Sequence, residues 1–292
     1  MEIVEREFGK ANLSLETGRL ARQANGSVLV RYGDTMVLVA ATAAPGSGAG
    51  ADFFPLSVFY VEKAYAAGRI PGGFFKREAR LSDSETLISR IIDRPLRPSF
   101  HENYLAETMI VATVLSHDLE FPSDVAAMIG ASAALSVSDI PLLQPIGGIR
   151  VGMIDGDFIT NPNPEEITNS QMNIFMAGSR DAILMVEGEA NEVSESVMLD
   201  ALWYGHEQIQ PIIDMQEELV QRCGKAKREV EAPPVDEDLM KIVYQAAPKK
   251  IQKALQIKEK QERYASLDEA SAEIVSEVGG EEADESVVAE IK

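Results

Sequence analysis

The sequence has 292 residues, 45% of them hydrophobic and 25% charged, so it can bury one large core or two modest ones. The formal net charge of -20 excludes a protein that binds nucleic acid over its whole surface, because a polyanion is repelled at long range. A single cysteine, apolar runs shorter than the roughly 18 residues of a membrane span, and the lack of a signal-peptide pattern lead us to expect a cytoplasmic protein without a membrane anchor.

The first half of the chain alternates between strand and turn signals. Runs rich in Val, Leu and other β-forming residues predict strands at 27–32, 35–42, 54–61 and 107–115. The first two flank Gly33-Asp34, which predicts a hairpin. A glycine-punctuated loop at 68–80 is followed by a helix, which begins at a capping box of Ser82 and Glu85.

Helix signals dominate the second half. The alanine-rich residues 124–137 predict a closely packed helix, and two or three short strands are predicted between 146 and 186. A long amphipathic helix follows at 191–223. Beyond Ala232-Pro233-Pro234-Val235, alternating apolar and charged residues predict helices only. The last residues carry no helix C-cap signal, so we expect a truncated piece of a longer protein. The pattern therefore predicts an α+β domain followed by an all-α domain.

Positive charge is concentrated in residues 62–97, the basic stretch. It holds eight Lys and Arg residues against five Asp and Glu residues, so it is +3 while the rest of the chain carries -23. Local basicity in an acidic protein indicates a confined binding site for an anion or a polyanion.

The loop within the basic stretch contains two adjacent aromatic residues, Phe74 and Phe75, next to Lys76, Arg77 and Arg80. Aromatic rings beside phosphate-neutralising cations hold single-stranded nucleic acid, with a gain of roughly 1–3 kcal/mol per stacked base. The alternative is that the two rings only pin the loop to the core. Composition alone supports both interpretations equally.

The helix after the loop carries an arginine row. At about 100° per residue, Arg90, Arg94 and Arg97 cluster on one helix face, beside its apolar sector. One guanidinium group can donate two parallel hydrogen bonds to phosphate oxygens, so the row could follow an RNA backbone. The alternative is a solvated face on which the arginines pair with acids such as Asp93 or Glu85.

Two segments resemble a known family. The run from Gly72 to Glu78 (GGFFKRE) and the run from Ser89 to Pro98 (SRIIDRPLRP) resemble the signature of the first ribonuclease-PH domain of bacterial polynucleotide phosphorylases. The resemblance extends from about Met1 into the later helices. It implies the ribonuclease-PH fold, similar to ribosomal protein S5 domain 2, a mixed sheet with packed helices. It assigns residues 1–230 to that domain and residues 235–292 to a truncated helical linker domain.

The resemblance also implies an activity. Members of this family degrade RNA from the 3′ end in mRNA turnover, with inorganic phosphate as co-substrate, and release nucleoside diphosphates. They form homotrimeric rings, use Mg²⁺ and take part in RNA-degradation complexes. The resemblance places Phe74, Phe75, Lys76 and Arg77 at the entrance or constriction of the central channel, where single-stranded RNA threads. Further candidate RNA-binding residues along this path are Arg80, Arg90, Arg94 and Arg97.

The family's catalytic residues belong mainly to a second copy of the domain, and this copy departs from them. Where the catalytic copy has an aspartate and a lysine, the sequence has Asn173 and Phe175, which are a poor Mg²⁺ ligand and an uncharged ring. Where the catalytic copy has a serine-rich phosphate loop, Asp124 stands at a helix start, and its charge repels phosphate. We therefore predict no catalytic or metal-binding residues in this chain. Its function is predicted as the RNA-guiding part of the exoribonuclease, or alternatively a non-catalytic RNA-binding and assembly module when alone.

The other polar clusters carry no prediction. His101, His117 and His206 lack the spacing of metal ligands, and Glu165-Glu166 is expected to be solvated.

Overall fold

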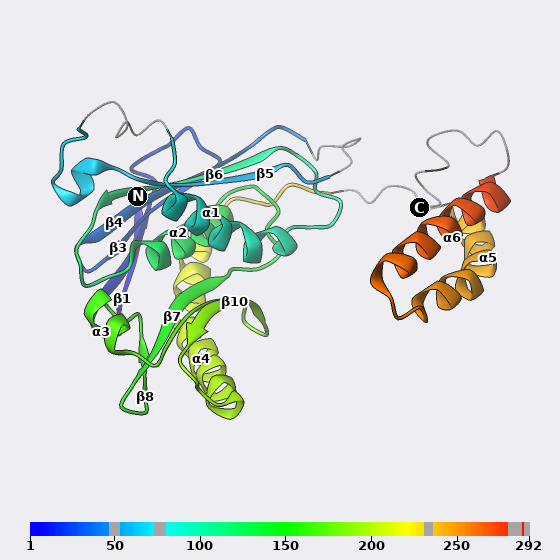
Figure 1. Ribbon diagram of the computed structural model, residues 1–292. Coiled ribbons are helices and arrows are strands. Elements are labelled where there is room, and N and C mark those ends of the chain that lie inside the picture. The colour runs from blue at the N-terminus through cyan, green and yellow to red at the C-terminus, as the bar shows by residue number, and fades with distance from the viewer. Residues whose placement is uncertain (47–52, 73–79, 231–235, 280–287, 289–292) are drawn as a thin grey trace. The chain divides into compact units, whose positions relative to one another are not determined.

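The computed structural model describes residues 1–46, 53–72, 80–230, 236–279 and 288 (Figure 1). The chain forms two compact units, Met1–Glu231 and Ala232–Lys292, here called the sheet unit and the hairpin unit. Among the described residues, no helix has both the length and the apolar character needed to cross a membrane.

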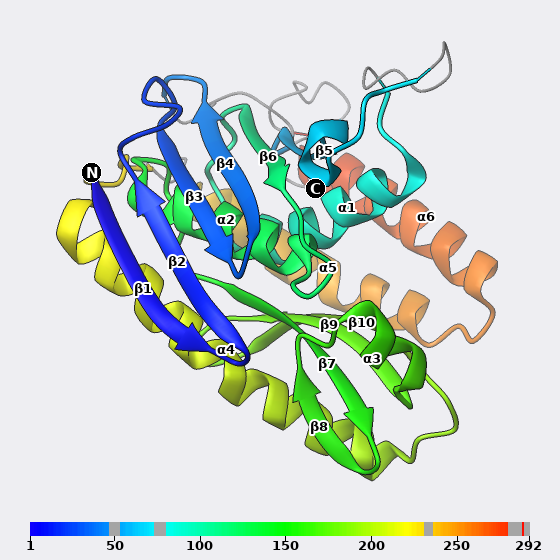
Figure 2. The same ribbon diagram turned by 90° about the vertical axis from the view of Figure 1, so that its left-hand side faces the viewer.

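The sheet unit is built on a six-stranded sheet with the order β1-β2-β3-β4-β6-β5. Its strands are β1 (Glu2–Phe8), β2 (Ala11–Thr17), β3 (Gly26–Tyr32), β4 (Thr35–Ala43), β5 (Leu56–Glu62) and β6 (Thr108–Ser116). β5 and β6 run parallel, and the other neighbouring pairs run antiparallel. Figure 2 shows β1 to β4 side by side, with α4 passing the β1 edge.

Helix α2 (Ser123–Val137) covers one face of this sheet and is buried along its whole length. Small residues permit this close contact. A Cβ atom on Gly130 would lie 2.6 Å from Val39 Cγ2 and 2.8 Å from Val30 Cγ2, so only glycine fits there. The predicted close packing of this alanine-rich helix is confirmed. Helix α1 (Asp83–Leu96) packs on β5, and its predicted capping box is present.

A second sheet of four strands has the order β10-β9-β7-β8. Its strands are β7 (Gly147–Ile154), β8 (Asp157–Thr160), β9 (Met172–Gly178) and β10 (Ile183–Ala190). The prediction of two or three strands here was therefore too low. Helix α4 (Glu195–Cys223) packs against β7 and β9, where Gly205 allows close approach to the Met176 side chain.

Among the strands and α-helices, β1, β2 and α3 were not predicted. β1 and β2 carry a charged or polar residue at most exposed positions, and β1 buries only Val4 and Phe8, so their apolar signal is weak. The segment expected to be a turn after Asn161 continues into the short helix α3 (Pro164–Asn169). A capping box between Asn163 and Glu166 starts this helix, and Glu166 also pairs with Lys10.

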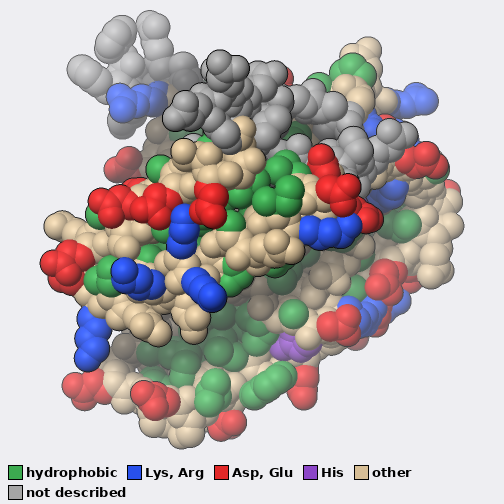
Figure 3. Space-filling view, turned by 90° about the vertical axis from the view of Figure 1, so that its right-hand side faces the viewer, with side chains coloured by type: hydrophobic (Ala, Val, Ile, Leu, Met, Phe, Trp, Pro, Cys, Tyr) green, Lys and Arg blue, Asp and Glu red, His purple; other side chains and the backbone are tan. Residues whose placement is uncertain are grey.

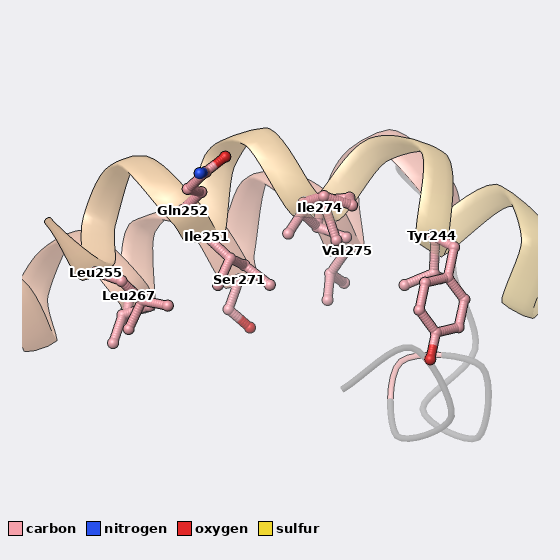
Figure 4. A pocket seen from close by; sticks show the side chains of 11 residues that line it. Tyr244, Ile251, Gln252, Leu255, Leu267, Ser271, Ile274 and Val275 are labelled. Carbon is pink, nitrogen blue, oxygen red and sulfur yellow. The ribbon is translucent and has the colours of Figure 1, made fainter.

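The hairpin unit consists, in its described part, of α5 (Glu237–Leu255) and α6 (Lys260–Gly279), as the all-α prediction requires. Ala247 and Ile274 form the centre of its small core. The apolar face of α5 continues past this core through Tyr244 and Leu255 and, together with α6, lines a groove of about 730 Å³ (Figure 4). Two helices alone do not cover this face, since Tyr244 is 71% exposed.

Candidate nucleic-acid interface

Both ends of the loop in the basic stretch are held at one corner of the sheet unit. The Glu85 carboxylate accepts hydrogen bonds from the backbone N–H of Ser82 (2.7 Å) and of Glu62 (2.8 Å), which joins the start of α1 to the end of β5. Burial raises the pKa of Glu85, but hydrogen bonds from Ser82 and Glu62, with the nearby Lys63, outweigh burial and bring the pKa below its ordinary value. Glu85 is therefore an ionised carboxylate that bridges the start of α1 and the end of β5; we call this bridge the Glu85 clasp.

The other end of the loop starts from a single 3₁₀ turn, η1 (Ala64–Ala67). The backbone N–H of Arg69 donates to Ala64 O (2.9 Å), and Gly68 takes the left-handed conformation (φ 65°) that closes such a turn. The backbone N–H of His117, just after β6, donates to Ala66 O (3.1 Å). The turn is thus fixed both within itself and to the central sheet.

Of the eight predicted RNA-binding residues, four lie outside the described residues: Phe74, Phe75, Lys76 and Arg77. Arg80 is the last predicted residue of the loop, two positions before the Ser82 cap, and it is exposed. The corner at which the loop begins and ends is therefore described, and the aromatic pair itself is not.

The three members of the arginine row differ. Arg97 donates to Phe54 O (3.0 Å) and Leu56 O (3.1 Å) and pairs with Asp93 (2.6 Å), so it ties the end of α1 to the start of β5. Arg94 pairs with Glu187 of β10. Arg90 is exposed and forms neither a hydrogen bond nor an ion pair within the described part of the chain. The alternative of a helix face on which arginines pair with acids therefore holds for Arg94 and Arg97 but not for Arg90.

A small cavity of about 230 Å³ lies beside η1, where the parallel strands β5 and β6 end and α2 begins. The polar residues lining it are Glu62, Lys63, Arg69, His117 and Ser123. Lys63 and Arg69 belong to the basic stretch, but the cavity that they share with His117 was not predicted from the sequence.

The residues that depart from the family's catalytic pattern meet around Arg150 of β7. Its guanidinium donates to Asp124 Oδ2 from Nε (3.0 Å) and from a terminal nitrogen (2.5 Å), and to Asn173 Oδ1 (2.9 Å). It also lies 5.5 Å from the centre of the Phe175 ring. The Asp124 side chain is 7% exposed. The Arg150 guanidinium therefore occupies the space in front of Asp124, a contact that was not predicted from the sequence.

This arrangement binds nothing further by simple charge. Asp124 neutralises Arg150, and the amide of Asn173 uses its oxygen on the same guanidinium. Within the described ranges, no group of three or more His, Cys, Asp or Glu side chains could hold a metal ion. The corner around η1, rather than the Arg150 cluster, is therefore the better candidate for an anionic ligand.

Comparison with family models gives three consecutive matches. Residues 11–141 match domain 1 of the 3′ exoribonuclease family, and residues 144–208 match domain 2 of that family. Residues 238–292 match the RNA binding domain of polyribonucleotide nucleotidyltransferase.

Curated relatives and a solved structure agree with these matches. The polyribonucleotide nucleotidyltransferase of Geotalea uraniireducens is 52% identical over 278 residues, which are 95% of this chain and 40% of that protein. The enzyme of the same name from Pelobacter propionicus is 51% identical over 279 residues, 96% of this chain and 40% of that protein. Rice (Oryza sativa) Rrp46 superposes with a TM-score of 0.57 over 74% of this chain and 96% of its own, at 20% identity, which shows a shared fold.

The predicted α+β ribonuclease-PH fold is thus confirmed, and so is the predicted family. The chain spans about 40% of the length of these curated relatives. It belongs to the polyribonucleotide nucleotidyltransferase family.

Proposed function

We propose that this chain is the RNA-gripping, non-catalytic portion of a phosphorolytic 3′-to-5′ exoribonuclease. The observation that carries the proposal is the basic loop of residues 68–80, which is held at both ends by the Glu85 clasp and the η1 turn, in a chain of this family. A loop anchored at both ends can present aromatic and basic side chains to a single strand without unfolding its supports.

Within this proposal, the predicted residues have different tasks. Phe74 and Phe75 stack on bases, while Lys76, Arg77 and Arg80 neutralise phosphates. Arg90, exposed on α1, continues the path. The two ion-paired arginines, Arg94 and Arg97, support the path by fixing α1 to β10 and β5.

The catalytic step takes place outside this chain. Residues 1–230 are the degenerate ribonuclease-PH-like domain, because Arg150 and Asp124 satisfy each other where a phosphate would need free donors. Residues 235–292 are part of a helical linker domain that also contributes to RNA binding. The remaining length of the enzyme supplies the Mg²⁺ ligands and the site for inorganic phosphate. The complete protein is a cytoplasmic homotrimer that acts in mRNA turnover, within an RNA-degradation complex.

The length of the relatives supports an enzyme portion over a self-sufficient binding module, since their matched part is only 40% of each protein. The test compares this chain with a longer relative, the polyribonucleotide nucleotidyltransferase of Geotalea uraniireducens, on a labelled oligoadenylate, with phosphate and Mg²⁺. We expect both proteins to bind the RNA and only the longer one to release ADP. Release of ADP by this chain, or no phosphorolysis by the longer protein, would contradict the proposal.

A further inference from the structure

We infer that Tyr65 is a fixed base-stacking platform at the foot of the RNA-gripping loop, and that Arg69 holds the phosphate next to the stacked base. The inference rests on the proposed function, because it takes single-stranded RNA as the ligand. It adds a contact that neither the sequence motifs nor the family matches assign.

The Tyr65 ring is unusually accessible for a tyrosine of the sheet unit. Tyr32, Tyr60 and Tyr104 are each at most 1% exposed and serve the core, whereas Tyr65 is 58% exposed. An exposed aromatic ring on a surface turn has an uncovered π-face, and every RNA base can stack on such a face.

The backbone that carries Tyr65 is fixed. Tyr65 O accepts from the N–H of Gly68 (2.9 Å), the N–H of Arg69 donates to Ala64 O (2.9 Å), and the N–H of His117 holds Ala66 O (3.1 Å). A ring on such a turn loses little backbone freedom when a base binds. The platform therefore differs from one carried by a long loop, which must be ordered at a free-energy cost.

The corner carries both cations and carboxylates. Lys63 and Arg69 flank Tyr65 in the chain, and both line the cavity beside η1, to which Glu62 also contributes and Tyr65 does not. The two acids nearby are already engaged, since Glu62 accepts a hydrogen bond from the Tyr60 hydroxyl (2.9 Å) and Glu85 accepts two from backbone N–H groups. These hydrogen bonds orient the two carboxylates but leave their charge, so we assign the phosphate contact to Arg69, which follows the Tyr65 turn and whose backbone N–H is bonded to Ala64 O.

Trp203 is another exposed aromatic ring of the sheet unit, but its acidic surroundings are unfavourable for RNA. Trp203 on α4 is 66% exposed, so its ring is as available as that of Tyr65. It lies in residues 151–221, here called the acidic lobe, in which Arg180 is the single Lys or Arg. Asp200 and Glu207 lie about one helical turn from Trp203, on either side of it in the same helix. Phosphates are repelled there, which makes Trp203 a matched control for an exposed aromatic ring.

The test measures the binding of a fluorescein-labelled decaadenylate to the 292-residue chain by anisotropy, over a series of salt concentrations. Y65A is expected to weaken binding about 5- to 150-fold, as a stacked base worth roughly 1–3 kcal/mol implies. Its slope of log K against log salt should stay unchanged, because no phosphate contact is lost. Y65F should bind like the wild type. R69A should reduce the slope by about 0.7, the value for one phosphate contact on a single strand.

Two controls separate stacking from other causes. W203A removes an equally exposed ring and should leave binding within twofold of the wild type. A decamer of abasic residues should bind the wild type and Y65A equally, because it offers phosphates without bases. Thermal unfolding should show that Y65A folds as the wild type does. If Y65A does not fold, Y65L takes its place, since leucine keeps the bulk but not the planar ring.

The outcomes are distinguishable from those of the proposed function. If the wild-type chain does not bind the decaadenylate, the proposed function itself fails and the platform fails with it. If the wild type binds and Y65A binds equally well, or if W203A loses as much affinity as Y65A, the platform is overturned while RNA gripping by the loop stands.

Discussion

Residues 62–97 and the acidic lobe belong to the same compact unit but have opposite chemistry. The basic stretch has eight Lys and Arg residues against five acids. The acidic lobe has one arginine, Arg180, and its acids are Asp155, Asp157, Glu165, Glu166, Asp181, Glu187, Glu189, Glu192, Glu195, Asp200, Glu207, Asp214, Glu217 and Glu218. Arg180 is itself held by Asp214 and Glu217, at 2.8 Å each.

The difference teaches where an acidic protein can bind a polyanion. In the part of the surface that Figure 3 draws in colour, basic and acidic side chains are interspersed. Within about one Debye length, 8–10 Å at physiological salt, local charge decides. For the RNA binding proposed above, the acidic lobe is therefore unfavourable, and the corner around η1 and the start of α1 is where we expect a strand to approach.

The largest expected effect concerns the buried Arg150–Asp124 pair, which lies outside both regions and joins α2 to β7. We predict that R150M lowers the free energy of unfolding by about 3–5 kcal/mol, because it leaves a buried carboxylate without its partner. Urea denaturation measures this loss. The double variant R150M/D124N should recover part of the stability, since no uncompensated charge remains. A loss below 1 kcal/mol in R150M would show that the pair does not neutralise a buried charge.

A second prediction concerns the clasp at the basic corner. E85Q replaces one acceptor oxygen by an NH₂ group that faces a backbone N–H, so it should destabilise the sheet unit by about 1–3 kcal/mol at pH 7. Because the pKa of Glu85 is lowered on folding, its contribution is present above the ordinary value of 4.5 and is lost as the pH falls through the folded value. The stability difference between wild type and E85Q, followed by urea denaturation, should shrink below pH 4.5. A difference independent of pH would contradict the charged clasp.

A smaller effect is expected for Arg97. R97A removes two hydrogen bonds to backbone carbonyls and the pair with Asp93, so we predict a loss of about 1–2 kcal/mol in urea denaturation. Its salt slope for RNA binding should equal that of the wild type. A reduced slope would assign Arg97 to direct phosphate contact instead of support.

The smallest effect is expected for the pair that joins α1 to β10. Arg94 and Glu187 are 50% and 44% exposed, so R94A should change the free energy of unfolding by less than about 1 kcal/mol. Thermal unfolding at low and high salt provides the measurement. A larger loss, insensitive to salt, would mean that this surface pair holds the two regions together.

The fold was predictable where the sequence signal is local. The Ser82 capping box located the start of α1, and alanine-rich composition predicted the close packing of α2. β1 was not predictable in this way, since it buries only Val4 and Phe8 among exposed charges and depends on pairing with β2.

The candidate site was predictable only in part, because only its local features leave a signal in the sequence. Adjacent aromatic and basic residues mark the loop in the sequence itself. The Arg150–Asp124 pair instead joins residues 26 positions apart on two elements that only the tertiary fold brings together. The exposure of Tyr65 is likewise a property of the folded surface, because the nearby Tyr60 is fully buried.

The central claim is that the basic loop grips RNA, and one measurement tests it most directly. The affinity of the 292-residue chain for a decaadenylate is measured over a salt series for the wild type and for the double variant K76A/R77A. The account predicts weaker binding and a salt slope reduced by about 1.4, the value for two phosphate contacts on a single strand. An unchanged affinity and slope would contradict it and move the RNA path away from the basic stretch.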